Sequence, residues 1–185
     1  MEVTLAPLPP EEVVAFWRQA GPERWFSKDE SFDASCRARF LAAHEHAAAG
    51  DLAAWEGTPE GALALLILLD QMPRNMFRGD PRTWATDSDA LRIAERAIDR
   101  GFDREVAPEM RRFFYLPFMH AEDLAAQERS VSLNEALNDP EINRFARHHR
   151  DIVARFGRFP HRNEVLGRMS TPDEIAFLAD DPFRG

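Results

Sequence analysis

The sequence predicts an all-α protein, and three observations support this prediction. Apolar residues recur at helical spacing through most of the 185 residues. Proline or a capping side chain opens nearly every periodic segment, and glycine closes several of them. No segment alternates apolar and polar residues between turn signals, as half-buried strands do. These patterns predict one helical domain over residues 1–185 with about seven to nine helices.

The segment that organises the predicted core is an apolar run at residues 62–69. A helix that is apolar on every side has no solvent-facing side and must be covered by other helices. Thr58 followed by Pro59 supplies a helix start, which predicts a buried central helix at 59–72. Pro73 lacks a backbone N–H and disfavours the helical conformation of the preceding residue, so we expect the chain to turn there.

Two helices are predicted before the central helix. The first begins near Pro10, where proline and acidic residues favour a helix start, and ends at Gly21. The second is capped by Ser31 or Asp33 and ends at Gly50. Both present aromatic residues on one face at helical spacing, which predicts that these faces are buried.

The helices predicted after the central helix have start and stop signals of their own. Thr86 or Asp87 caps the first of them, and Pro117 interrupts apolar sequence after the second. Ser170 or Thr171 caps the last helix, which is expected to bury Ile175. The predicted ranges are 87–100, 103–115, 121–137, 140–156 and a final helix from 172 onward.

Composition limits the classes of partner. The formal net charge of −9 argues against nucleic acid and anionic membranes as general partners. Residues 144–168 are the exception, because they contain seven arginines against two carboxylates. Cys36 is the only cysteine and lies on an apolar helical stripe, which excludes an internal disulfide and predicts a buried, inert thiol. The first residues lack the pattern of a secretory signal, so we expect a cytoplasmic protein.

Several catalytic and metal-binding motifs are excluded. His149-Arg150-Asp151 imitates a kinase catalytic loop, but Phe156 replaces the required asparagine. His44 and His46 are two residues apart and cannot share a helical face, so we expect them at the surface or its edge. No zinc-protease motif, di-iron motif or glycine-rich phosphate loop occurs. We therefore predict no metal site, and the sequence names no cofactor.

Three polar groups remain, and each is flanked by apolar sequence that should draw it inward. The first contains Asp70, Arg74, Asn75 and Arg78, the second His120, Glu122, Asp123 and Gln127, and the third Arg158, His161, Arg162 and Asn163. In one hypothesis they form a single pocket for a small anionic ligand, a phosphate or a carboxylate. The candidates for acid–base or hydrolytic catalysis are then Asp70, Glu122 and His161. The candidates for ligand binding are Arg74, Asn75, Arg78, His120, Asp123, Gln127, Arg158, Arg162 and Asn163. In the other hypothesis the same residues form a buried structural network of ion pairs and helix caps.

Three long blocks carry a family resemblance. They read LLDQMPRNMFRG at 68–79, YLPFMHAEDLAAQERSV at 115–131 and HRDIVARFGRFPHRNEVLGR at 149–168. These blocks resemble the hallmark blocks of a bacterial family known as domain of unknown function 924. The resemblance implies a tetratricopeptide-like superhelical arrangement around the central helix, and it implies no activity, substrate or cofactor. The blocks contain the three polar groups.

Two function classes therefore stay open. The first is a protein with one polar pocket that binds a small anionic ligand. The alternative is a tetratricopeptide-like scaffold that binds a protein or peptide in a helical groove, with purely structural polar groups. The oligomeric state is not set by the sequence.

Overall fold

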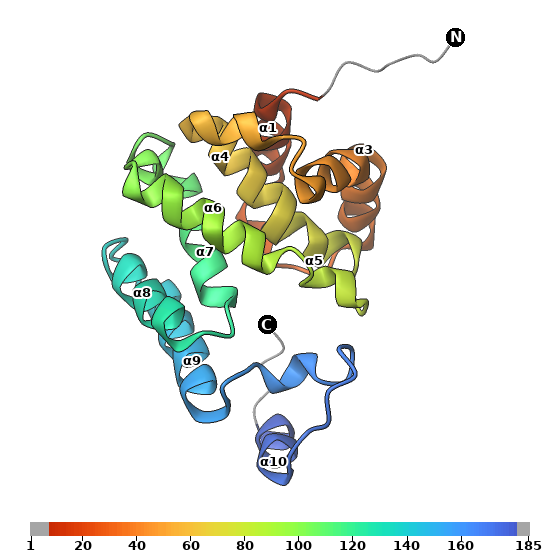
Figure 1. Cartoon of the computed structure of the whole chain (residues 1–185), viewed down its shortest axis with the longest axis vertical. Coiled ribbons are helices and arrows are strands. Elements are labelled where there is room, and N and C mark those ends of the chain that lie inside the picture. The colour runs from red at the N-terminus through yellow and green to blue at the C-terminus, as the bar shows by residue number, and fades with distance from the viewer. Residues whose placement is uncertain (1–7, 181–185) are drawn as a thin grey trace. The chain divides into compact units, whose positions relative to one another are not determined.

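The computed structural model describes residues 8–180, and all regular structure within them is helical, which confirms the all-α prediction (Figure 1). The tetratricopeptide-like arrangement stays a prediction. The α-helices are α1 (Pro10–Ala20), α2 (Pro22–Trp25), α3 (Glu30–Ala49), α4 (Pro59–Leu66), α5 (Met72–Met76), α6 (Asp87–Asp99), α7 (Arg112–His120), α8 (Leu124–Glu135), α9 (Pro140–Phe156) and α10 (Pro172–Asp180). Short 3-10 turns occur at Ala53–Gly57, Pro81–Thr83, Phe102–Arg104, Pro108–Met110 and Pro160–Arg162.

The chain divides into two compact units. The first contains Met1–Arg78 and Arg82–Pro117, and the second contains Gly79–Pro81 and Phe118–Gly185. The main boundary between the two units follows Pro117, inside α7, where the sequence shows no linker.

The core of the first unit is built on α4. Residues 61–73 are all buried, as a helix without a polar side requires. Helix α4 contacts α1 and α6, while α3 contacts α5 and the segment between α4 and α5 (Figure 1). The side chain of Thr58 caps α4 by accepting a 3.1 Å hydrogen bond from the backbone N–H of Gly61. The predicted start and burial of the central helix are therefore confirmed.

The predicted end of the central helix is wrong. The chain does not turn at Pro73 but passes through a π-helical turn, Ile67–Gln71, and continues as α5 to Met76. The backbone N–H of Met72 donates to the carbonyl of Ile67, five residues earlier. This wider turn places Pro73 in the first turn of a new helical segment, where its missing N–H and fixed φ are tolerated.

Side chains from α3 and from the residue before α6 contact two backbone carbonyls of the π turn. The Nδ1 atom of His44, on α3, lies 2.9 Å from the carbonyl oxygen of Leu68. The hydroxyl of Thr86 donates a 2.5 Å hydrogen bond to the carbonyl of Leu69, and it does not cap α6. His44 is thus buried, contrary to the surface prediction, and burial lowers the pKa of its imidazole.

The N-cap of α3 lies two or four residues before the two caps that we predicted, Ser31 and Asp33. This residue is Asp29, whose carboxylate accepts from the backbone N–H groups of Ser31 and Phe32. Asp33 is therefore not a cap and is available for other contacts. Cys36 is buried as predicted, and burial raises the pKa of its thiol to about 12.

Gly61→Ala is expected to destabilise the protein by about 2 kcal/mol, because overpacking against a backbone atom cannot relax cheaply. An added Cβ would lie 2.1 Å from the carbonyl oxygen of Trp55. Alanine in an ordinary helical position would instead stabilise by about 1 kcal/mol. Gly57→Ala is the control, since nothing lies within 4 Å of its Cβ. Urea denaturation of both variants measures the effect, and a Gly61→Ala protein as stable as the wild type would contradict it.

Candidate functional site

The first predicted polar group is organised around Arg74, which follows the π turn. Its guanidinium donates two 2.9 Å hydrogen bonds to Asp87 and one of 2.5 Å to the carbonyl of Asp70. The fully buried carboxylate of Asp70 lies 3.4 Å from the same guanidinium. Burial alone would lower the pKa of Arg74, but the charges of Asp87 and Asp70 outweigh it and raise that pKa. Arg74 therefore pairs with two carboxylates of the first unit.

The other members of this group hold Asp33. Arg78 donates to both carboxylate oxygens of Asp33, at 2.5 and 3.1 Å, and also to the carbonyl of Ser27. The amide of Asn75 donates a 2.8 Å hydrogen bond to the same carboxylate. Sequence reasoning did not select Asp33, although its position three residues before Cys36 places it on the buried face of α3.

The second group lies where α7 ends, and its backbone is tied to side chains of the second unit. The amide nitrogen of Gln127 donates to the carbonyls of Met119 and Ala121, at 2.7 and 2.8 Å. Arg162 donates a 3.0 Å hydrogen bond to the carbonyl of His120, between them. Gln127 is fully buried, and its Oε1 atom has no hydrogen-bond partner in the described part of the chain. This segment is therefore held firmly on both sides of His120.

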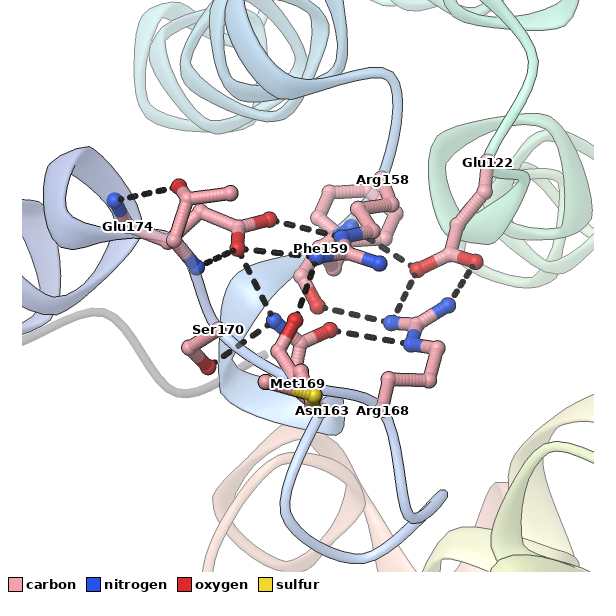
Figure 2. Close-up of polar contacts among 9 residues, drawn as sticks. Glu122, Arg158, Phe159, Asn163, Arg168, Met169, Ser170 and Glu174 are labelled. Carbon is pink, nitrogen blue, oxygen red and sulfur yellow. Dashed lines mark hydrogen bonds and ion pairs between the residues drawn. The ribbon is translucent and has the colours of Figure 1, made fainter.

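Glu122 connects this segment to the loop after α9 (Figure 2). Its carboxylate accepts from both terminal nitrogens of Arg168, with closest distances of 2.6 and 2.9 Å, and from the backbone N–H of Phe159 at 2.8 Å. Burial raises the pKa of Glu122, but these hydrogen bonds and the nearby charge of Arg162 outweigh burial and lower it. The next residue, Asp123, caps α8 with a 2.8 Å hydrogen bond.

Two members of the third group form hydrogen bonds with Glu174, in the first turn of α10 (Figure 2). Arg158 donates to both carboxylate oxygens of Glu174, at 2.6 and 2.9 Å, and Asn163 donates at 3.3 Å. The hydrogen bonds from Arg158 lower the pKa of Glu174 to about 2, although burial opposes this. Thr171 and Glu174 also form a reciprocal capping box, which is the sequence signal that could have identified Glu174. Ile175, which was expected inside, is 59% exposed instead.

Two imidazoles and one guanidinium lie around the ring of Phe159, and a third imidazole lies beside one of them. We call His120, His149, His161 and Arg162 the imidazole cluster. The ring centroids of His149 and His161 lie 5.6 and 5.8 Å from that of Phe159. The centroid of His120 lies 6.5 Å from that of His149, and the guanidinium carbon of Arg162 lies 4.6 Å from the Phe159 centroid. His120 and His161 are half-buried, so the cluster has an accessible edge.

His149 is the most deeply placed imidazole of the cluster. Its Nδ1 atom lies 2.8 Å from the carbonyl of Phe145, and because a carbonyl only accepts, the proton resides on Nδ1. Burial lowers the pKa of His149 to about 3, assisted by the positive charges of His120, His148 and Arg162. At neutral pH the ring is therefore neutral, with its lone pair on Nε2.

The second and third groups come together in the second unit through the contacts of Glu122 and Arg162. The first group belongs to the first unit, and its described contacts lie there. The hypothesis that all three groups share one pocket stays a prediction. Sequence reasoning missed the partners Asp33, Asp87, Arg168 and Glu174.

Two hollows are described, and neither is lined by a predicted site residue. One of about 640 Å³ lies beside α9, and one of about 200 Å³ lies between the end of α3, α4 and α6. Within residues 8–180 no group of three or more histidine, cysteine or carboxylate side chains could hold a metal ion. No helix in the same residues is long and apolar enough to cross a membrane.

Comparison with known proteins identifies relatives without a known activity. A solved structure of a protein of unknown function from Agrobacterium tumefaciens, ATU0120, is similar with a TM-score of 0.90 and 49% sequence identity. The match covers 93% of this chain and 97% of that chain. A search of the curated proteins returns no match. The family model described as bacterial protein of unknown function (DUF924) matches residues 13–181, and the chain belongs to this family.

Proposed function

We propose that the protein binds a small anionic ligand, a phosphate or a carboxylate, at the imidazole cluster of the second unit. The observation that carries the proposal is the gathering of Arg162, His149 and His161 around Phe159, with His120 beside His149. Guanidinium and imidazole N–H groups are the side-chain donors best suited to carboxylate and phosphate oxygens.

The electrostatics of the cluster favour a negative charge. Burial is the main cause of the lowered pKa of His149, and the permanent charge of Arg162 acts in the same direction, as do the charges that His120 and His148 carry when protonated. These charges make the potential at this imidazole more positive. A bound anion would oppose that potential and raise the pKa of the imidazoles it touches. By linkage, an anion that raises these pKa values binds together with a proton, so its affinity increases as the pH falls.

The hydrogen bonds around the cluster narrow the choice of acid–base groups. Asp70 pairs with Arg74 in the first unit, and Glu122 is held by Arg168 and the backbone. Both carboxylates are therefore better suited to structure than to proton transfer. His161 stays the best of the three catalytic candidates, because it is half-buried and belongs to the cluster. Any acid–base or hydrolytic step is assigned to His161 with His120.

Titration of the full chain with inorganic phosphate and with citrate, followed through the histidine ring signals in NMR, tests the proposal. We expect the signals of the cluster to shift at saturation. The affinity should increase up to about tenfold for each pH unit between pH 7.5 and 5.5, as uptake of one proton requires. His161→Gln should weaken binding about tenfold, as loss of one hydrogen bond to a charged group does.

The matched control for this titration is His46→Gln, because His46 is exposed on α3 in the first unit. Arg162→Lys keeps the charge but removes the planar donor geometry, and it should weaken binding without unfolding the protein. The proposal fails if neither anion binds, or if binding is the same in His161→Gln and at both ends of the pH range.

The ion pairs described above favour a second candidate, the protein- or peptide-binding scaffold. Arg74, Arg78 and Arg158 each pair with a carboxylate of their own unit, as a structural network requires. If the wild-type protein binds no anion in the titration, these groups serve folding. Pull-down of one stoichiometric partner that protects the protein from unfolding would then support the scaffold.

A further inference from the structure

The loop after α9 contains two members of the imidazole cluster together with the ring that they contact. These members are His161 and Arg162, and the ring is that of Phe159. His120, the other half-buried imidazole, is the last residue of α7 and lies far earlier in the sequence. An anion site that uses His120 and His161 together therefore requires contacts that hold this loop against the end of α7.

One carboxylate, that of Glu122, provides such contacts (Figure 2). It lies two residues after His120, and its Oε1 atom accepts a 2.8 Å hydrogen bond from the backbone N–H of Phe159. Arg168 donates to both oxygens of this carboxylate, at 2.6 and 2.9 Å, and it also donates a 3.1 Å hydrogen bond to the carbonyl of Phe159. The ion pair of Glu122 and Arg168 thus binds both backbone polar groups of the residue whose ring lies in the cluster.

Arg168 also closes the loop on itself. Its Nε atom donates a 2.9 Å hydrogen bond to Oδ1 of Asn163, and its backbone N–H donates one of 2.8 Å to the carbonyl of the same residue. Between these contacts, Arg162 donates to the carbonyl of His120 at 3.0 Å. The loop and the end of α7 are therefore joined by one connected network, and the position of His161 relative to His120 depends on it.

We infer that Glu122 and Arg168 are positioning residues of the anion site, which act by holding Phe159 in place and do not touch the ligand. Their side chains are only 25% and 24% exposed, and their charges are used in the ion pair. The inference rests on the proposed function, and it adds the pair of residues that fixes His161 relative to His120.

Glu122→Gln separates positioning from charge, because the two effects have opposite signs. The charge of Glu122 lies close enough to Arg162 for the two to interact, so its removal alone would strengthen the binding of an anion. If Glu122 instead holds Phe159, the neutral amide loses its charge-assisted pairing with Arg168 and the site loosens. In the NMR titration of the full chain we expect phosphate and citrate to bind about tenfold more weakly, as loss of one well-aligned hydrogen bond to a charged group does.

The matched control is Glu174→Gln. Glu174 also pairs with one arginine, Arg158, through hydrogen bonds of 2.6 and 2.9 Å, and it also accepts from a backbone N–H, that of Thr171. Its contacts hold the start of α10 and not the backbone of Phe159. The variant should lose stability as Glu122→Gln does, but it should bind both anions like the wild type.

The histidine ring signals of the ligand-free protein provide a readout that a merely structural role would not move. The ring centroids of His149 and His161 lie 5.6 and 5.8 Å from that of Phe159, so its ring current contributes to their signals. These signals should shift in Glu122→Gln and stay unchanged in Glu174→Gln. A loss of global stability alone would leave the signals of the folded protein in place.

Arg168→Lys is a second test, and it changes no charge. Lysine cannot donate to Glu122, Asn163 and the carbonyl of Phe159 together, so binding should weaken and the ring signals should shift as in Glu122→Gln. The inference is overturned if the wild type binds an anion while Glu122→Gln binds it equally or more tightly, or if neither variant shifts the ring signals. A wild-type protein that binds neither anion would overturn the proposed function itself, and this inference with it.

Discussion

Replacing Arg74 with methionine is expected to lower the free energy of unfolding by about 3–5 kcal/mol. Arg74 is shared by Asp87 and by Asp70, whose side chain is fully buried. Without the guanidinium, both carboxylates keep their burial but lose this neutralising charge, and a buried charge without compensation is costly. Denaturant unfolding at neutral pH, monitored by circular dichroism, measures the change.

A matched variant and a rescue show whether this effect comes from the carboxylates. Arg92→Met, in the same unit, removes an exposed ion pair with Asp89 and should change stability by less than about 0.5 kcal/mol. Arg74→Met combined with Asp87→Asn should be more stable than Arg74→Met alone, because one of the two negative charges is gone. If Arg74 instead served a ligand, Arg74→Met would lose affinity for that ligand and keep wild-type stability.

The sequence predicts the helices well where their signals are local. Thr58 with Pro59 and Asp139 with Pro140 fix helix starts through side chains within three residues, and the structure has these caps. Gly50 and Gly157 end helices in the left-handed conformation, which costs glycine little. Local capping chemistry explains why these boundaries were predictable.

The continuation through Pro73 depends on contacts far away in the sequence. His44, on α3, and Thr86, just before α6, contact the carbonyls of Leu68 and Leu69. Neither contact can be recognised from the residues next to Pro73, so the local effect of proline predicted that the helix ends there. The π turn is stable because these side chains satisfy carbonyls that an unbroken α-helix would satisfy internally.

In the candidate site, too, local features were predictable and contacts between distant residues were not. Burial between apolar segments correctly identified polar residues that lie inside, such as Asn75 and Gln127. Their partners could not be predicted, because Asp33 is 45 residues from Arg78 and Glu122 is 46 residues from Arg168. A sequence shows which polar side chains must be satisfied, but pairing over such distances is decided by how the helices pack.

The stability of the protein is expected to fall as the pH decreases from about 6.5 to 5, and His149 should cause much of this fall. The pKa of His149 is about 3 in the folded protein, against an ordinary value of 6.5. Between these values the unfolded chain binds a proton that the folded protein does not, so acid favours unfolding. One such group lowers the free energy of unfolding by about 1.4 kcal/mol per pH unit, or about 2 kcal/mol by pH 5. His44, whose pKa is also lowered by burial, contributes in the same direction.

His149→Asn isolates this contribution, because asparagine can still donate to the carbonyl of Phe145 but does not titrate. The variant should be less stable than the wild type at pH 7.5, yet its stability should fall less steeply toward pH 5. Ile152→Val, a buried change in the same helix, should lower stability without changing the slope. Measurements above pH 5 avoid the titration of Glu122 and Glu174, whose pKa values are lowered from 4.5. Equal slopes in the wild type and His149→Asn would mean that His149 accepts its proton in the folded state. The positive potential proposed to attract an anion to the imidazole cluster would then be weaker than the described geometry requires.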